Sequence, residues 1–556
     1  MGDFVAKKTL ITAGLPYSNG DLHVGHIAGC YLPADIYNRY LKMQGKESLY
    51  VCGSDDHGVA IVISAKQKGI CPEEVVAYYH ERQQKAFAGL MIDFDHYGST
   101  SKSPTHKEVS EDLFLKLHDK GYFSKETTEQ FYDIESKAFL PDRYVKGTCG
   151  FCGAENQNGD QCEQCGKILD TDSLKDPQST LSGGEVVKKP TVHWFLDLTK
   201  SEEVVAQWLD EADVRDNTKA FVKGLLGAGL VKRSMTRDIS WGLPVPLDDP
   251  DAQGKVLYVW FDAPIGYISN VKDLMIENDK GPEAYKNWWN NKDTDVYHFI
   301  GEDNTVFHCI IWIAMLQAYG DYNLPKGVIV NNFMNVKVGE EVEKISKSKG
   351  NAVAILDYLE LERDPEYLRY YLSMIAPEKA RTNFNEAEFF QACNSDLADT
   401  LGNFINRAFA FGNKYFEGKM PSYEEILWGD LEKTLVEKTE HCHNKMTEHL
   451  NNFSTRNAMR EFFEFARYCN KYFNDKAPWV SRKTDMADAG LAVAMSLNAA
   501  QSMAVFLAPF LPVKSKKILS SFGTEEVLAW SDYKSYTKSG TQVTAPGVLF
   551  PKFDIS

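Results

Sequence analysis

The chain has 556 residues, too many for one hydrophobic core, so we expect three or four structural units. Its 43% hydrophobic and 25% charged residues are typical of a globular protein, and no run of about 18 uninterrupted apolar residues could cross a bilayer. We therefore expect a cytoplasmic protein with no membrane partner. The net charge of −17 argues against nucleic-acid binding without excluding it, because a basic groove can lie within an acidic protein.

The first 120 residues alternate between short apolar runs and amphipathic stretches. KKTLITAGL at 7–15 predicts a buried parallel strand that ends at Pro16. Residues 26–43 have apolar side chains at helical spacing, and Pro33 should kink or restart that helix. Another apolar run at 48–53 leads into SDDHG, and a further helix follows. This repeated strand–loop–helix pattern predicts a doubly wound parallel sheet.

The rest of the chain suggests how this α/β fold is divided. The pattern stops near residue 120, where the chain becomes polar and glycine-rich, and it resumes at 258–261 and 297–300. We expect a Rossmann-like domain split into 1–119 and 231–325 by an inserted domain at 120–230. A linking segment at 326–390 should lead into an all-α bundle at 391–556, where long amphipathic stretches replace strand signals.

Two imidazoles flank a glycine at His23-Val24-Gly25-His26, just after the first predicted strand. The N-terminus of the next helix would attract a phosphate, and Gly25 would let a nucleotide approach the backbone. The two histidines could donate hydrogen bonds as negative charge builds up on the phosphate. A histidine at the start of a helix is more often a cap or a surface residue, so this motif alone is weak.

A second motif, Lys344-Ile345-Ser346-Lys347-Ser348, lies between Gly339 and Gly350. Such a string is as often a solvated basic turn as a functional loop. Flanking glycines would let it move over a bound triphosphate and exclude water. Because HxGH and KISKS occur in this order around alternating strands and helices, they predict an ATP site. There a carboxylate would attack the α-phosphate, pyrophosphate would leave, and Mg²⁺ would accompany the ATP.

Four of the eleven cysteines form two CxxC pairs, Cys149-x₂-Cys152 and Cys162-x₂-Cys165. Two such pairs can bring four thiolates into tetrahedral reach of one ion. A closed set of four thiolates leaves no open position for a substrate, so we expect one structural Zn²⁺. Redox-active CxxC pairs and an iron–sulfur cluster are the alternatives.

Eight strings spread over nearly the whole chain carry a family resemblance. They are AGLPYSNGDLHVGH (13–26), CGSDDHG (52–58), PDRYVKGTC (141–149), TRDISWG (236–242), YVWFDAPIGY (258–267), YHFIGEDNTVFH (297–308), KISKSKG (344–350) and DKAPWV (475–480). Together they resemble the methionyl-tRNA synthetases, which are class I aminoacyl-tRNA synthetases.

The resemblance implies a methionine–tRNA ligase. Such an enzyme activates L-methionine with ATP to methionyl-adenylate, releases pyrophosphate and transfers methionine to the 3′-terminal adenosine of tRNA(Met). By the resemblance, His23, His26, Lys344 and Lys347 are catalytic. The ATP-binding residues would be His23, Gly25, His26, Gly301, Asp303 and Lys347.

The resemblance also implies the residues that recognise methionine and tRNA. The methionine site would comprise Leu15, Tyr17, Asp55, Trp260, Pro264, Tyr267, Phe307 and His308. Aromatic side chains suit a thioether, and Asp55 would accept hydrogen bonds from the substrate ammonium group. Arg237 matches an arginine beside the active site. Asn403, Arg407 and Trp479 match residues that read the anticodon, since aromatics stack on unpaired bases. Each aromatic taken alone is more often a core residue.

Three alternatives remain open on the sequence alone. A cysteinyl-tRNA synthetase also uses zinc, but it needs an open metal position. A small-substrate nucleotidylyltransferase shares the HxGH chemistry but needs no helix bundle. A non-catalytic paralogue would be expected to lose the histidines or the lysines. The chain ends without the extra C-terminal dimerisation domain of some relatives, so a monomer is expected.

Overall fold

The computed structural model describes residues 8–140, 144–159, 162, 164–165, 167, 169, 172–338, 341–344, 353–524 and 528–554. These residues form two compact units. The first unit comprises the chain up to Asp21 together with Leu49–Lys85 and Phe94–Val330. The second comprises Leu22–Ser48, Ala86–Asp93 and the chain from Asn331 onward.

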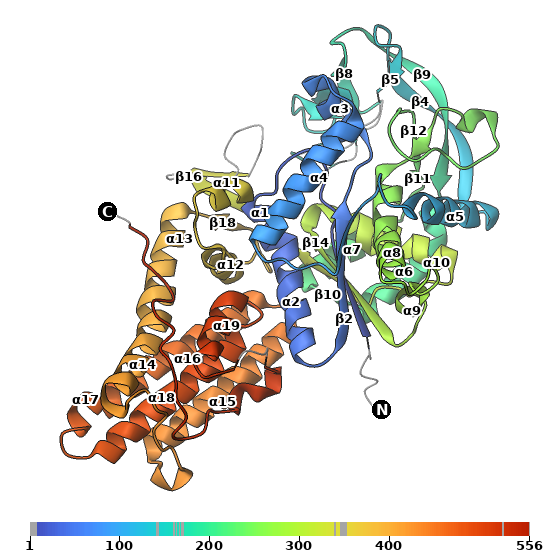
Figure 1. The fold of residues 1–556 in the computed structure, drawn as a ribbon. Coiled ribbons are helices and arrows are strands. Elements are labelled where there is room, and N and C mark those ends of the chain that lie inside the picture. Colours follow the sequence, from blue (N-terminus) through green and yellow to red (C-terminus); the bar gives the residue numbers. More distant parts are fainter. Residues whose placement is uncertain are drawn as a thin grey trace. The chain divides into compact units, whose positions relative to one another are not determined.

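The first unit is built on a six-stranded sheet in the order β10-β15-β14-β1-β2-β3 (Figure 1). Its strands are β1 (Lys8–Ala13), β2 (Glu47–Ser54), β3 (His96–Ser99), β10 (Asp213–Val214), β14 (Thr294–Gly301) and β15 (Gly327–Asn331). The pairs β1–β14, β2–β3 and β10–β15 are parallel. Strand order reverses between β1 and β14, and ligands of such sheets bind at the carboxyl ends of the strands at this point. The predicted α/β fold class is confirmed.

Helices connect the strands of this sheet and form its core. They are α3 (Val59–Lys68), α4 (Pro72–Gly89), α5 (His106–Asp119), α8 (Val259–Glu277), α9 (Lys286–Trp289), η5 (Glu302–Asn304), η6 (Phe307–Ile311) and α10 (Trp312–Tyr319). Helix α8 is buried continuously from Phe261 to Met275, so neighbours surround it on all sides. It is therefore a rigid support for any side chain that it carries.

The segment between β3 and α8 contains most of the antiparallel structure. Strands β4 (Phe123–Asp133) and β9 (Val186–Leu196) pair along their full length in a sheet ordered β11-β9-β4-β5. A smaller sheet, β7-β6-β8, carries the first cysteine of the CxxC pairs. The remaining elements are β5 (Ala138–Phe139), β6 (Val145–Cys149), β7 (Gln157–Asn158), β8 (Leu174–Ser179), η3 (Leu198–Ser201), α6 (Glu202–Glu211), α7 (Asp216–Ala228), β11 (Arg233–Ser234), β12 (Thr236–Arg237), η4 (Pro250–Ala252) and β13 (Val256–Leu257).

The second unit begins with one continuous helical stretch. It consists of α1 (Val24–His26), the π-helix η1 (Ile27–Tyr31) and α2 (Leu32–Met43), and Pro33 stands in the first turn of α2. The helical stretch thus passes from π-helix to α-helix at this point instead of restarting at the proline. A three-stranded sheet, β17-β16-β18, and the helices α11 and α12 follow later in the chain. Their bounds are β16 (Met334–Val338), β17 (Glu341–Lys344), α11 (Ile355–Glu360), α12 (Pro365–Met374) and β18 (Thr382–Phe384).

The C-terminal part of the second unit is the predicted helix bundle (Figure 1). It contains α13 (Glu386–Ala392), η8 (Cys393–Gly402), α14 (Asn403–Phe416), η9 (Glu425–Leu427), α15 (Asp430–Asn451), α16 (Thr455–Lys476), α17 (Pro478–Ser481), α18 (Met486–Leu507), α19 (Pro512–Ser520) and η10 (Trp530–Lys534). Among the described residues, α18 alone is long and apolar enough to cross a membrane, and it is wholly buried. It is the core helix of the bundle.

A buried ion pair joins the first helices of the second unit to its bundle. Arg369 of α12 and Asp35 of α2 are both inaccessible to solvent, and their side chains approach to 2.7 Å. The same guanidinium donates to the carbonyl oxygens of Leu90 (3.0 Å), Pro509 (3.0 Å) and Phe510 (2.7 Å). Because a buried guanidinium without partners would be strongly unfavourable, these contacts fix the chain segments around it.

Candidate functional site

The two motif histidines build the start of their own helix. The backbone N–H of Gly25 donates to Nδ1 of His23 (3.2 Å), and the backbone N–H of His23 donates to Nδ1 of His26 (3.2 Å). This reciprocal arrangement is a capping box, and the two rings stack at a centroid distance of 3.6 Å. Since both Nδ1 atoms accept hydrogen bonds, each neutral ring carries its proton on Nε2.

The chain that follows the KISKS motif lies directly against HxGH within the second unit. Val24 N–H donates to the carbonyl of Val353 (3.1 Å), and Ile355 N–H donates to the carbonyl of Leu22 (2.9 Å). His23 and Ala354 form an antiparallel bridge. The Lys344 backbone ends β17, whereas the side chain of Lys344 and the whole of Lys347 lie outside the described residues. The structure therefore brings residues 353–355, which follow KISKS in the sequence, against HxGH.

The expected methionine residues gather in the first unit at the carboxyl ends of the parallel strands. Leu15 and Tyr17 follow β1, Asp55 follows β2, and Phe307 and His308 follow β14. Trp260, Pro264 and Tyr267 come from the first half of α8. Tyr17 also forms a parallel bridge with Asp55. The side chains thus come from four chain segments that the sheet brings to one edge.

Aromatic rings form the half-buried wall of this cluster. Trp260 stacks on Phe307 with ring centroids 4.0 Å apart and an interplanar angle of 10°. Tyr17 meets the Trp260 ring edge-on at 6.1 Å. A side chain at Gly266 would come within 2.9 Å of Leu15, so the glycine lets Leu15 lie against α8. The wall offers apolar and π surface of the kind that suits a thioether.

Two buried histidines lie behind the wall with their tautomers set by neighbours. His308 Nδ1 faces the carbonyl of Asn304 (3.0 Å), so its Nε2 accepts from the Tyr267 hydroxyl (2.8 Å). Trp312 Nε1–H donates to His298 Nε2 (3.1 Å). Burial lowers the pKa of His308 to about 4, and it lowers the pKa of His298 well below its ordinary value. Both rings are therefore neutral near pH 7.

Asp55 brings a carboxylate into the same cluster. It is 2% exposed, and among the described residues its Oδ1 atom has no hydrogen-bond partner. Burial, reinforced by the nearby carboxylates of Asp262 and Asp56, raises its pKa well above the ordinary value. The Asp55 backbone is fixed, because its N–H donates to Pro16 O (2.9 Å) and its carbonyl accepts from Ser18 N–H (3.0 Å). A buried acceptor atom without a donor points to a bound donor group.

The next residue, Asp56, has a structural role that sequence reasoning missed. Its carboxylate accepts hydrogen bonds from the hydroxyls of Ser18 (2.5 Å), Ser99 and Ser101 (3.0 Å). Its carbonyl accepts from the indole N–H of Trp241 (2.6 Å). The residue thus ties together the loops after β1, β2 and β3. The only signal in the sequence was its place beside Asp55 in CGSDDHG.

Three other expected residues stand near these loops. Arg237 of β12 lies over the ring of Tyr258 at 3.6 Å and donates to the carbonyls of Ser234 (3.0 Å) and Thr236 (2.9 Å). Gly301 ends β14, and the exposed Asp303 follows in η5. Both of the latter lie at the point where strand order reverses. This is the edge at which a nucleotide binds in such sheets.

The four motif cysteines come together in the first unit. Their sulfur atoms all lie within 4.8 Å of one another, with Cys149–Cys165 at 3.9 Å and Cys152–Cys162 at 3.6 Å. Sulfur atoms at about 2.3 Å from a tetrahedral zinc ion are about 3.8 Å apart, so the observed spacing fits such an ion. Gly153 turns back at φ +78°, and its N–H donates to the carbonyl of Cys149 (2.8 Å). No pair is disulfide-bonded.

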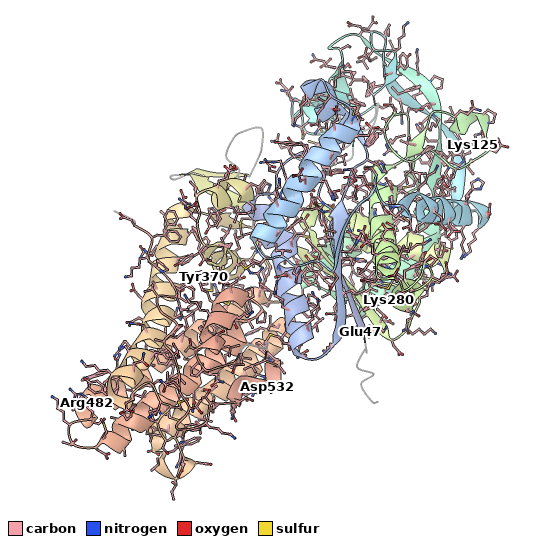
Figure 2. The ribbon with its side chains drawn as sticks, viewed as in Figure 1. Glu47, Lys125, Lys280, Tyr370, Arg482 and Asp532 are labelled. Carbon is pink, nitrogen blue, oxygen red and sulfur yellow. The ribbon has the colours of Figure 1, made fainter. Side chains whose placement is uncertain are left out.

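The expected anticodon residues meet on the surface of the helix bundle. Trp479 is 40% exposed and the guanidinium of Arg407 lies 5.5 Å from its ring centroid. Arg407 also donates to Asn474 (2.8 Å), and Asn403 lies one helical turn before it on α14. Arg482, labelled in Figure 2, follows α17 and lies over the ring of Tyr415 at 4.5 Å. The patch combines cations with an exposed aromatic.

Comparison with known proteins assigns both parts of the chain to one family. Residues 9–409 match the family described as tRNA synthetases class I (M). Residues 423–555 match the anticodon binding domain of methionyl tRNA ligase. These matches decide against a cysteinyl-tRNA synthetase and against a small-substrate nucleotidylyltransferase.

Individual relatives agree with the family models. A methionine–tRNA ligase of Bacteroides fragilis is 42% identical over 99% of this chain and 79% of its own length. The ligase of Pyrococcus furiosus is 39% identical over 98% of this chain and 75% of its own length. The fold is similar to that of Mycobacterium tuberculosis methionyl-tRNA synthetase in complex with methionyl-adenylate, with a TM-score of 0.81, 22% identity and coverage of 98% of this chain and 100% of that one. The chain therefore belongs to the methionyl-tRNA synthetases, the class I ligases that join methionine to its tRNA.

Proposed function

We propose that this methionine–tRNA ligase (EC 6.1.1.10) binds methionine in the cluster at the carboxyl edge of the parallel sheet. The buried Oδ1 atom of Asp55, which lacks a hydrogen-bond donor among the described residues, is the observation that carries the proposal. A substrate ammonium group would supply the missing donor and would favour the ionised carboxylate. The Tyr267 hydroxyl donates a hydrogen bond to the neutral imidazole of His308, so this pair would present no charge to the thioether of methionine.

The HxGH histidines would stabilise the transition state of methionine activation. The substrate carboxylate attacks the α-phosphorus of ATP, the bond to the β-phosphate oxygen breaks, and pyrophosphate leaves. His23 and His26, held by their Nδ1 atoms, would donate from Nε2 to the phosphate oxygens. Lys344 and Lys347 would add positive charge, and Gly25, Gly301 and Asp303 would contact the nucleotide. Mg²⁺ would accompany ATP and offset the charge of the leaving pyrophosphate.

In the second step the terminal hydroxyl of the tRNA would attack the carbonyl carbon of the adenylate, and AMP would leave. Asn403, Arg407 and Trp479 would read the anticodon at the bundle. One Zn²⁺ held by Cys149, Cys152, Cys162 and Cys165 would stabilise the small sheet around it and take no part in bond making. We further propose a cytoplasmic monomer, and light scattering would test the oligomeric state.

Calorimetry on the Asp55→Ala variant tests this proposal. Loss of one partner of a buried charge pair typically costs about 2–5 kcal/mol, so methionine affinity should fall by roughly 30- to 5000-fold. ATP affinity should change by less than about threefold, because Asp55 would not contact ATP. Asp56→Asn serves as a comparison, since it perturbs the neighbouring loops without removing the acceptor. Unchanged methionine binding in Asp55→Ala would refute the assignment.

A further inference from the structure

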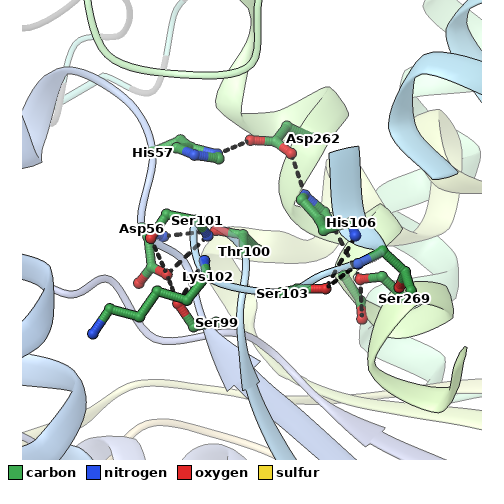
Figure 3. Close-up of polar contacts among 12 residues, drawn as sticks. Asp56, His57, Ser99, Thr100, Ser101, Lys102, Ser103, His106, Asp262 and Ser269 are labelled. Carbon is green, nitrogen blue, oxygen red and sulfur yellow. Dashed lines mark hydrogen bonds and ion pairs between the residues drawn. The ribbon is translucent and has the colours of Figure 1, made fainter. Parts of the chain in front are cut away.

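A chain of buried hydrogen bonds links His57, Asp262 and His106 (Figure 3). Asp262 binds His57 Nδ1 through Oδ2 at 2.6 Å and His106 Nε2 through Oδ1 at 2.5 Å. His106 continues to the hydroxyl of Ser269 through Nδ1 at 2.9 Å. Asp262 and His106 are inaccessible to solvent and His57 is 5% exposed. The chain therefore connects the loop after β2, helix α5 and helix α8 through groups that the proposed reaction does not use.

Two neighbouring members of this chain, Asp262 and His57, stand beside the two halves of the proposed methionine site. Asp262 lies on α8 between Trp260 and Pro264, which belong to the aromatic side of that site. His57 lies two residues after Asp55, and the backbone N–H of His57 hydrogen-bonds to the Asp55 carboxylate, which lowers the pKa of that group. A shift of the His57 side chain would therefore also shift its backbone N–H, and with it the Asp55 carboxylate that would accept from the substrate ammonium group.

The local packing leaves the loop little freedom to take another position. Gly58 has φ +94°, and a β-carbon there would lie 3.2 Å from the side chain of Val259, the first residue of α8. The ring of His57 is also covered by Trp241, edge-on at 5.7 Å. The loop after β2 therefore lies close against α8, and the hydrogen bond from His57 to Asp262 fixes the position of the loop along that helix.

The charges along the chain agree with this arrangement. Burial disfavours ionised Asp262, but His57 and His106 outweigh it and hold the pKa of Asp262 below the ordinary value. Burial likewise disfavours protonated His57, and Asp262 raises the pKa of His57 in spite of it. After burial, the same Asp262 carboxylate contributes to the raised pKa of Asp55, so the hydrogen-bond chain is also linked electrostatically to that group.

A metal ion bound by His57, His106 and Asp262 is the competing interpretation, because their ligand atoms lie within 4.8 Å of one another. Two ligands bound to zinc at about 2.0–2.1 Å are about 3.3 Å apart in a tetrahedral site. The observed separations of 2.6 and 2.5 Å are those of hydrogen bonds to a charged group.

We propose that Asp262 is a positioning residue for methionine, which acts through His57 to hold the Asp55 carboxylate at a fixed place opposite the aromatic wall. It touches neither substrate nor nucleotide. This inference rests on the proposed role of Asp55 as the acceptor for the ammonium group. It predicts that the effect of Asp262 on methionine recognition requires the Asp55 carboxylate.

A double-mutant cycle tests the inference through methionine-dependent ATP–pyrophosphate exchange. Asp262→Asn keeps the shape of the side chain but can accept from only one histidine. It should lower kcat/KM for methionine by roughly 10- to 100-fold, mainly through KM, with KM for ATP within about twofold. In an Asp55→Asn background the same substitution should change kcat/KM by less than about threefold, because the group through which it acts is gone.

A matched control comes from Asp273, another buried aspartate of α8. It accepts hydrogen bonds from Ser103 (2.5 Å) and Thr105 (2.6 Å) just before α5, and neither partner belongs to the proposed methionine site. Asp273→Asn should leave KM for methionine within about twofold. His57→Asn keeps a donor near the position of Nδ1 and should retain more methionine recognition than His57→Ala, which should resemble Asp262→Asn.

The outcomes separate this inference from the one on which it rests. If Asp55→Asn leaves KM for methionine unchanged, the assignment of Asp55 is wrong. If Asp55→Asn impairs recognition but Asp262→Asn adds its full effect in that background, Asp262 is an ordinary core residue and the inference fails. A second metal ion per chain that is lost in His57→Ala would also overturn it, in favour of a metal site.

Discussion

His23 has a structural role that can be separated from its proposed catalytic role. Its Nδ1 atom caps the helix by accepting from Gly25 N–H, whereas Nε2 would act on ATP. Asparagine is a strong helix cap but cannot reach as far as an imidazole. We expect His23→Asn to lower the exchange rate by roughly 10²–10³-fold, as for loss of one transition-state donor, with KM for methionine little changed.

Denaturation experiments on the same variants complete this test. His23→Ala should lose the cap as well as the donor, so its unfolding free energy should fall by about 0.5–2 kcal/mol, whereas His23→Asn should unfold like the wild type. An Asn variant that keeps near-full exchange activity would show that His23 is a helix cap and nothing more.

His308 makes the stability of the first unit depend on pH. Its pKa is lowered to about 4 by burial, whereas an unfolded chain has a histidine pKa of about 6.5. Between these values the unfolded state binds more protons, so stability falls as pH falls through this range. From pH 7 to pH 5 we expect a loss of about 2 kcal/mol from this residue.

Thermal unfolding at the two pH values measures this effect. His308→Gln can still accept a hydrogen bond from Tyr267 but does not titrate, so its Tm should fall less between pH 7 and pH 5 than that of the wild type. His298, whose pKa is also lowered, chiefly by burial, is present in both proteins. Equal losses of Tm in the two proteins would contradict the prediction.

At the scale of elements, the four-cysteine cluster should stabilise the sheet β7-β6-β8. Cys149 ends β6 and is buried, so its loss should weaken metal retention and loosen this sheet. We expect Cys149→Ser to bind well below one zinc ion per chain and to be cut faster by protease in this region. Cys71→Ser, at an exposed cysteine outside the cluster, should retain the metal. Iron in place of zinc in the wild-type protein would instead support an iron–sulfur cluster bound by these four cysteines.

Elements were predictable where an apolar run dictates burial. Within the predicted run at 7–15, Lys8–Ala13 form β1 of the parallel sheet, because an apolar run suits a strand covered on both faces. The long pair β4–β9 was not foreseen, because its strands are polar, partly exposed and separated by more than fifty residues. The π-helices η1 and η6 were also missed, since apolar spacing does not distinguish their hydrogen bonds from those of an α-helix.

The sequence predicts those parts of the candidate site that lie in short, recognisable motifs. HxGH and the CxxC pairs could be read from their spacing, and the methionine residues from the family resemblance. The contacts of Asp262 with His57 and His106 join positions 205 and 156 residues apart in the sequence. An aspartate within a largely apolar helix gives no hint of such partners, so only the fold could reveal them.

At the scale of the whole molecule, replacing Trp479 should affect only one of the two reactions of the enzyme. This residue lies in the second unit on the bundle and would stack on an anticodon base, an interaction worth about 1–3 kcal/mol. We expect Trp479→Ala to lower kcat/KM for tRNA aminoacylation by roughly 5- to 150-fold, with methionine-dependent exchange near the wild-type rate.

The adjacent residue provides the control for this experiment. Val480 is 57% exposed but offers no stacking surface, so Val480→Ala should leave both activities unchanged. A parallel fall of exchange and aminoacylation in Trp479→Ala would mean that the tryptophan supports the fold of the bundle. No change in either activity would mean that the bundle does not read the anticodon through this residue.

The hydrogen bond between Val24 and Val353 holds the chain that follows KISKS beside HxGH. Lys347 precedes Val353 by six residues, and a chain of six residues spans at most about 20 Å. An ammonium group tethered within this length of Val353 would have an effective concentration at HxGH on the order of tens of millimolar. A small alkylammonium ion added to a Lys347→Ala variant would have to reach that concentration before it could begin to restore activity.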